Sequence, residues 1–125
     1  MITIHRIAIA SMTLLAAALA ATPAAAQAKP AVAVVELDVR QPEAFAKEFF
    51  PLVAKIFADA GGTFLVRPSP PTAVDDVAPK RVAIIRFESK EKALATLASP
   101  AYRDARKIGD QYASFRVFVV EMSAP

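Results

Sequence analysis

Residues 32–39 alternate between two kinds of side chain, and a period of two is typical of a strand with one buried face. One side of this predicted strand is entirely apolar and consists of Ala33, Val35, Leu37 and Val39. The other side begins with valines and ends with carboxylates: Val32, Val34, Glu36 and Asp38. We expect the first side to pack against a core and the second to carry any chemistry.

The next segment has apolar residues at helical spacing, and these are Phe45, Phe49, Leu52, Val53, Ile56 and Ala60. Pro42 fits the first position of a helix, although Gln41 before it is a poor N-cap. Pro51 removes a backbone donor and should kink or split the helix. Gly61 and Gly62 are expected to end it, because glycine adopts the left-handed conformation readily.

The second half of the chain repeats this order of elements. Ser89 and Ser99 are each expected to cap a helix, and the second helix starts at Pro100 and reaches about Gly109. A proline-rich loop is predicted over residues 68–80. Three further strands are predicted, over residues 63–67, 81–88 and 115–121.

The resulting order, β-α-β-β-α-β, predicts an α+β, ferredoxin-like fold. Its four-stranded antiparallel sheet carries both helical segments on one face, with the first and third strands at the centre. The other face should display Val32, Val34, Glu36, Asp38, Arg67 and Arg86. Because much of this set is apolar, we expect two copies to pair their sheets as a dimeric α/β barrel, forming a symmetric homodimer with a small cavity inside.

Residues 1–28 have the pattern of a secretory signal peptide. Arg6 precedes an apolar run over residues 7–21, and Ala26-Gln27-Ala28 supplies small residues at the cleavage site. A retained membrane anchor is the alternative, but the run is shorter than the roughly 20 residues needed to span a bilayer. We therefore predict cleavage after Ala28, leaving residues 29–125 as one domain, periplasmic or secreted and free of the membrane.

Composition excludes several classes of site. The 125 residues contain no Cys, no Trp and no Asn, and the one histidine, His5, lies in the predicted signal peptide. A Cys/His zinc site, a His-ligated haem and a histidine general base are therefore excluded from the mature domain. The net charge of +3 comes without a basic run, which argues against nucleic-acid binding. We expect no metal and no cofactor.

Residues 32–122 resemble the domain of unknown function 1330 family, within the dimeric α/β-barrel superfamily. The matching pieces are VVELDV followed by PEAF, then GGTFLVR, KRVAIIRF, SPAYRDAR and FRVFVVE. The resemblance implies a ferredoxin-like, dimeric fold and no defined activity. Family members often carry a Trp-Tyr pair before the Ser-Pro step, where this chain has Thr96, Leu97 and Ala98, and glycines where it has Pro68-Ser69-Pro70-Pro71.

Five residues are candidates for a ligand site: Glu36, Asp38, Arg67, Arg86 and Tyr102. Glu36 and Asp38 are two apart on one strand and point to the same side. Arg86 is expected on the neighbouring strand across from one of them, with Arg67 and Tyr102 at the rim. Such a set would suit a small anionic or phenolic ligand, with a carboxylate as base and an arginine as anion clamp. Alternatively, the charges are ordinary cross-strand pairs and Tyr102 packs on the sheet.

Three functions stay open at this point. The protein could bind a small ligand between paired sheets, could be a cofactor-free monooxygenase or isomerase, or could be a structural dimer without ligand. Within the superfamily that it resembles, haem-degrading and peroxidase-like chemistry depends on a histidine that residues 29–125 lack. The sequence does not decide whether the protein is an enzyme, and it indicates no particular catalytic residue.

Overall fold

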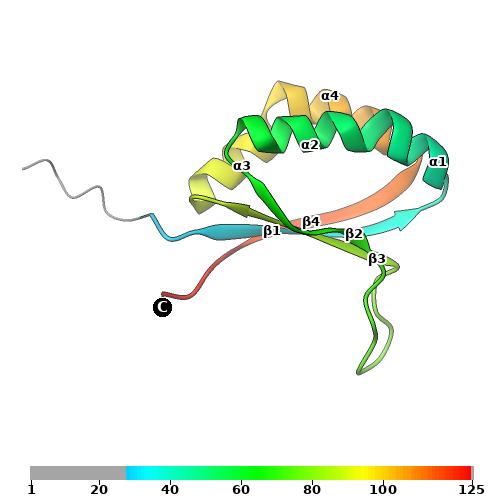
Figure 1. Ribbon diagram of the computed structural model, residues 1–125, viewed down its shortest axis with the longest axis horizontal. Helices are drawn as coiled ribbons and strands as arrows, with labels where there is room; N and C mark the ends of the chain where they lie inside the picture. The colour runs from blue at the N-terminus through cyan, green and yellow to red at the C-terminus, as the bar shows by residue number, and fades with distance from the viewer. Residues whose placement is uncertain (1–27, 125) are drawn as a thin grey trace, which may run out of the picture.

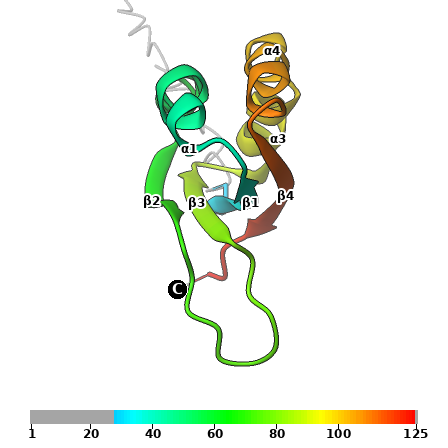
Figure 2. The same cartoon turned by 90° about the vertical axis from the view of Figure 1, so that its right-hand side faces the viewer.

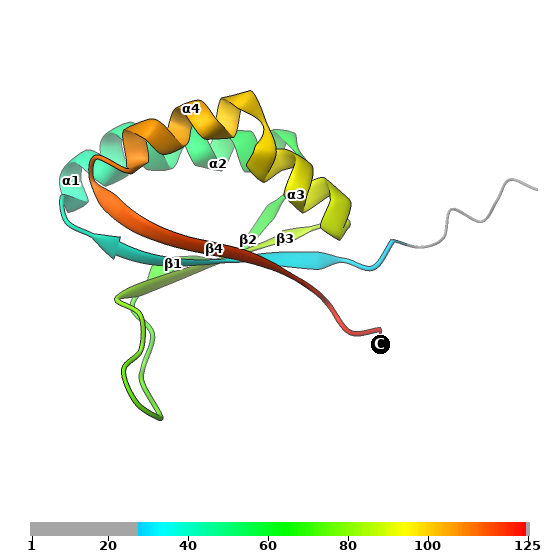
Figure 3. The same ribbon diagram turned by 180° about the vertical axis from the view of Figure 1, so that it is seen from behind.

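The computed structural model describes residues 28–124, which form a four-stranded antiparallel sheet with every helix on one face (Figures 1 and 3). The strand order is β2-β3-β1-β4, so β1 and β3 lie at the centre as predicted. This confirms the ferredoxin-like α+β fold. In chain order the elements are β1 (Ala31–Val39), α1 (Pro42–Ala44), η1 (Phe45–Phe49), α2 (Phe50–Asp59), β2 (Thr63–Ser69), β3 (Arg81–Phe87), α3 (Lys90–Ala98), α4 (Pro100–Gly109) and β4 (Ala113–Glu121).

Prolines shape the first helical segment, which consists of α1, η1 and α2, as predicted. Pro42 opens α1, and Gln41 before it makes no capping hydrogen bond through its side chain. Pro51 cannot donate a backbone hydrogen bond, and the turn before it widens into the π-helical segment η1, where the Phe50 N–H donates to the Phe45 carbonyl. The helix is therefore divided into α1, η1 and α2. The last segment, α2, ends at Asp59, and Gly61 two residues later has a φ of 79°, which suits glycine.

Serine caps define the starts of the second helical segment, which consists of α3 and α4. The Oγ of Ser89 accepts a hydrogen bond from the Lys92 N–H at 3.0 Å and starts α3. The Oγ of Ser99 accepts from the Tyr102 N–H at 3.2 Å, and Pro100 follows as the first residue of α4. Both predicted caps are confirmed. Each cap satisfies a backbone donor that the first turn of a helix leaves unpaired.

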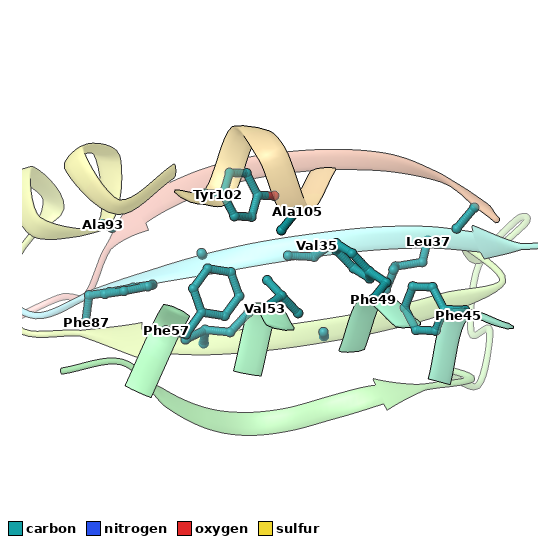
Figure 4. Close-up of a cluster of buried hydrophobic side chains, with 14 residues drawn as sticks. Val35, Leu37, Phe45, Phe49, Val53, Phe57, Phe87, Ala93, Tyr102 and Ala105 are labelled. Atoms are coloured by element: carbon teal, nitrogen blue, oxygen red, sulfur yellow. The ribbon is translucent and has the colours of Figure 1, made fainter. Parts of the chain in front are cut away.

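The core lies between the helices and the sheet and is rich in aromatic rings (Figure 4). Phe57 is 3% exposed and has three aromatic neighbours. Its ring stacks on Tyr102 with centroids 5.8 Å apart, meets Phe87 edge-on at 5.8 Å, and lies 5.9 Å from Phe64. These contacts connect α2 to α4, β3 and β2, so Phe57 joins the two helical segments to each other and to the sheet.

No helix within residues 28–124 covers the opposite face of the sheet, as Figure 2 shows. An apolar band crosses β3, β1 and β4 on this uncovered face, and it consists of Val32, Val34, Ile84, Phe118 and Val120. Val34 lies at its centre, paired with Ile84 on one side and Phe118 on the other. Phe118 and Val120 are 42% and 49% exposed. A single copy therefore leaves a continuous apolar surface in water.

The edge strand β2 is irregular, and a long loop follows it. The β2–β3 pairing shifts register between Phe64 and Val66 and again between Val66 and Ser69. Pro68 lacks a backbone donor and is tolerated because β2 is an edge strand. Residues 70–80 then project away from the helices on the side of the uncovered face (Figures 1 and 2).

Candidate functional site

The carboxylate of Glu36 is held by an arginine that the sequence analysis did not single out. Glu36 on β1 lies opposite Arg116 on β4, and the Arg116 Nε donates to the Glu36 Oε2 at 2.5 Å. The side chain of Glu36 is 23% exposed, and that of Arg116 is 76% exposed. This hydrogen bond, with the attraction of the opposite charge, raises the pKa of Arg116. The guanidinium of Arg116 therefore keeps its positive charge beside this carboxylate.

Around this pair, the uncovered face has an open groove at one end, with several polar side chains among its lining residues. It has a volume of about 320 Å³ and is lined by residues from β1, β4 and the end of the β2–β3 loop. The polar lining consists of Glu36, Asp38, Lys80, Ser114 and Arg116. Asp38 lies opposite Ser114, and within residues 28–124 its carboxylate makes no ion pair. The groove thus presents two cations, two carboxylates and a hydroxyl to solvent, a set that can bind a small polar ligand.

Arg86 does not join this groove, so its predicted pairing with the carboxylates is wrong. It pairs with Val32 on β1, whereas Glu36 pairs with Val82. The two charged residues are therefore four positions apart along the sheet, or about 13 Å. Arg86 does lie on the uncovered face, as predicted, but at the opposite end of the apolar band. The antiparallel pairing of β1 and β3 could be predicted from the sequence, but the register of that pairing could not.

This register changes what removal of Arg86 should do. Because Arg86 is exposed and far from the carboxylates, Arg86→Met should leave none of them unpaired. We expect the free energy of unfolding to change by no more than about 0.5 kcal/mol. Urea melts of the wild type and the variant measure this difference. A loss of several kcal/mol would show that Arg86 does compensate a buried charge.

Arg67 was predicted on the uncovered face, and this is also wrong. The guanidinium of Arg67 lies on the helix side, 5.8 Å from the ring centroid of Phe50 and 6.0 Å from that of Phe64. The cause is the register shift after Phe64, which leaves Leu65 as an extra residue and makes Val66 the partner of Ile84. One inserted residue reverses the side to which every later side chain points.

Tyr102 does not line a cleft on the uncovered face, so its predicted place at the rim is wrong as well. It is 6% exposed and stacked on Phe57 in the helix-side core (Figure 4). Its hydroxyl accepts a hydrogen bond from Arg106 at 3.4 Å. This position corresponds to the alternative in which the ring packs and the hydroxyl stays at the edge of the core.

The structure thus brings together two of the five predicted residues, Glu36 and Asp38, and places the other three elsewhere. Arg116 and Lys80, which complete the groove, were missed. Alternation in the last strand, with Phe115 inward, indicates that Arg116 points outward, but only the register shows that it meets Glu36. In the part of the chain that the structure describes, no group of three acidic, His or Cys side chains is arranged to hold a metal ion.

Comparison with known families identifies the chain. The profile described as "Domain of unknown function (DUF1330)" matches residues 30–123. The chain belongs to the DUF1330 family. No protein with a curated description matches this DUF1330 chain. None of the helices within residues 28–124 has the length and hydrophobicity that crossing a bilayer requires.

Solved structures show the same fold at low identity. A protein of unknown function from Rhodopseudomonas palustris is 19% identical over 78% of this chain and 85% of that one, with a TM-score of 0.58. The cofactor-independent oxygenase SnoaB from Streptomyces nogalater is 17% identical over 78% and 97%, with a TM-score of 0.56. A candidate antibiotic biosynthesis monooxygenase from Nitrosomonas europaea is 16% identical over 79% and 95%, with a TM-score of 0.50. The shared backbone arrangement supports the ferredoxin-like α+β fold, and identities this low assign no residue roles.

Proposed function

We propose that this DUF1330 protein is an exported homodimer that pairs the uncovered faces of two sheets and binds a small anionic or phenolic ligand between them. The observation that carries the proposal is the apolar band across β3, β1 and β4, centred on Val34. A second copy of the same sheet would remove this surface from water. The twofold arrangement pairs the band with itself, which suits a face that is apolar at its centre and charged at its ends.

The β2–β3 loop supports the pairing of two copies. Val74 and Val77 on this loop are 93% and 90% exposed, although both are fully apolar side chains. The loop projects beyond the uncovered face, where a partner sheet would lie (Figure 2). In a dimer the loop can pack on the partner's edge and cover these valines. Asp76 holds the tip in shape, with a φ of 56° and a hydrogen bond from the Val77 N–H to its carboxylate.

The groove beside Glu36 and Arg116 supplies the ligand chemistry. It opens onto the uncovered face beside the apolar band, so a partner sheet would close it and lower its exposure to water. Lys80 and Arg116 would attract an anion, and Asp38 could accept the proton of a phenolic hydroxyl. Because Glu36 is already bound to Arg116, Asp38 is the carboxylate that remains available to a ligand.

The same carboxylate favours one alternative function. A cofactor-free monooxygenase or isomerase needs a base that removes a proton from an activated substrate. Asp38 meets the requirement of access, and the fold is shared with a cofactor-independent oxygenase. Ligand binding without turnover is the simpler function, because it needs only the charges that line the groove and no base and oxyanion donor positioned together on a substrate.

Export rests on sequence alone, because the predicted signal peptide lies outside the described residues except for Ala28. Its placement in the periplasm or outside the cell follows from Arg6, the apolar run over 7–21 and the small residues up to Ala28. The described domain begins with β1 at Ala31, so cleavage after Ala28 would leave every strand and helix intact.

Native mass spectrometry of the protein purified from its own host tests these points together. We expect a chain that begins within about two residues of Lys29, since signal peptides are removed on export. We also expect a dimer of that chain that carries a small organic adduct. A full-length chain in the membrane fraction would contradict export. A monomer would contradict the paired sheets, and a dimer that never carries a ligand would favour the structural alternative.

A further inference from the structure

A second pocket lies on the helix side of the sheet, away from the uncovered face. Its volume is about 230 Å³, and it opens between the first helical segment (α1, η1 and α2) and the ends of β2 and β3. Six of its lining residues are apolar, and two are arginines. The ones that matter for binding are Phe45, Phe50, Pro68, Arg67 and Arg81.

The two arginines bring positive charge to the pocket without a neutralising partner. Arg81 lies opposite Leu37, a core residue, so its half-buried side chain points to the helix side. The Arg67 guanidinium lies over the rings of Phe50 and Phe64. Within residues 28–124, neither side chain forms an ion pair, and no carboxylate lines the pocket. Two guanidiniums beside hydrocarbon walls favour an anion, since the walls reduce competition from water.

The apolar part of the pocket continues inward. Phe45, Phe50 and Pro68 also border a smaller cavity of about 30 Å³ inside the core. The widened turn η1 forms this boundary, because Phe45 begins it and the Phe50 N–H closes it. π-Helical turns often occur at functional sites, where they displace side chains from regular helical positions. The pocket therefore combines two guanidiniums with apolar walls that border the core.

We propose that this pocket binds a small organic carboxylate, with its carboxylate on Arg67 and Arg81 and its apolar body against Phe45 and Phe50. A volume of about 230 Å³ lies below the range of drug-sized sites, so a single-ring acid or a short branched acid fits best. The planar, forked guanidinium matches a carboxylate in geometry as well as charge. The pocket lies on the other side of the sheet from the proposed dimer interface, so its ligand is independent of the one between the sheets.

The test uses 4-fluorobenzoate as the probe, with binding followed by fluorine NMR line broadening on the full mature domain. We expect saturable binding, and at least about tenfold weaker binding of the neutral isostere 4-fluorobenzyl alcohol. Arg67→Met and Arg81→Met should each weaken benzoate binding by about tenfold or more, and Arg67→Lys should weaken it less. Arg86→Met is the matched control, because it removes an exposed arginine from the opposite face and should leave the affinity unchanged.

Several outcomes would overturn the proposal. Equal affinity for the acid and the alcohol would show that the arginines do not recognise charge, and absence of saturable binding would remove the site. Loss of binding in Arg116→Met with full binding in Arg67→Met would place the probe in the groove between the sheets instead. Far-UV circular dichroism of each variant confirms folding, and Arg67 is exposed enough that its replacement should not disturb the core.

Discussion

Replacing Phe57 with alanine should lower the free energy of unfolding by about 3–5 kcal/mol, the usual cost of emptying a buried aromatic site. Phe57 is 3% exposed and contacts Phe64, Phe87 and Tyr102. Its loss would leave a cavity between α2, α4 and the sheet that these rings cannot close without moving the helices. In a domain of this size, the midpoint of thermal unfolding should fall by more than about 10 °C.

Leu52→Ala is the matched control for this substitution, because Leu52 lies on the same helix, α2, and is 42% exposed. It removes apolar atoms from the surface, so the expected loss is about 1 kcal/mol or less. Both variants should be melted at the same protein concentration, since dimer formation makes the apparent stability depend on concentration. Equal losses of unfolding free energy in the two variants would show that Phe57 does not join the two helical segments.

The second large effect is expected on the uncovered face. Val34→Glu places a carboxylate at the centre of the apolar band, between Ile84 and Phe118. A buried charge without a partner costs about 3–5 kcal/mol, and twofold symmetry introduces it from both copies. The dimer dissociation constant should therefore rise by at least about 100-fold. The separate chain should stay folded, because Val34 faces away from its core.

Leu94→Glu provides the comparison for this charge. Leu94 lies in α3 on the helix side and is 46% exposed, so its replacement adds the same charge outside the proposed interface. Sedimentation equilibrium over a concentration series should report a dimer for the wild type and Leu94→Glu, and a monomer for Val34→Glu. A dimer that survives Val34→Glu unchanged would mean that the chains associate through another surface.

Much of the fold could be predicted because local signals agreed with one another. Alternation in residues 32–39 identified β1 and its two faces, and the serine caps and prolines placed the helix starts. Pro51 indicated a disturbed helix, although the form of the disturbance, a π-helical turn, depends on how η1 packs against the sheet and α4. These signals are local in sequence, so they do not require the arrangement of distant strands.

The candidate site was harder to predict because it depends on register. Glu36 and Asp38 share a strand, and alternation alone placed them together. Arg86 was misplaced by four positions along β3, and Arg67 was assigned to the wrong face because a β-bulge follows Phe64. A bulge reflects the curvature and edge position of β2, and alternation in a short strand does not reveal it.

Thiol labelling tests the paired uncovered faces most directly, because the chain contains no cysteine of its own. Phe118→Cys places one thiol on the apolar band, and Leu94→Cys places one on the helix side, at positions that are 42% and 46% exposed in the single chain. We predict that a maleimide labels Phe118→Cys at least about tenfold more slowly than Leu94→Cys at high protein concentration, and that dilution into the monomer range removes the difference. Equal labelling rates at every concentration, in a protein that sediments as a dimer, would contradict the pairing of the sheets through this face.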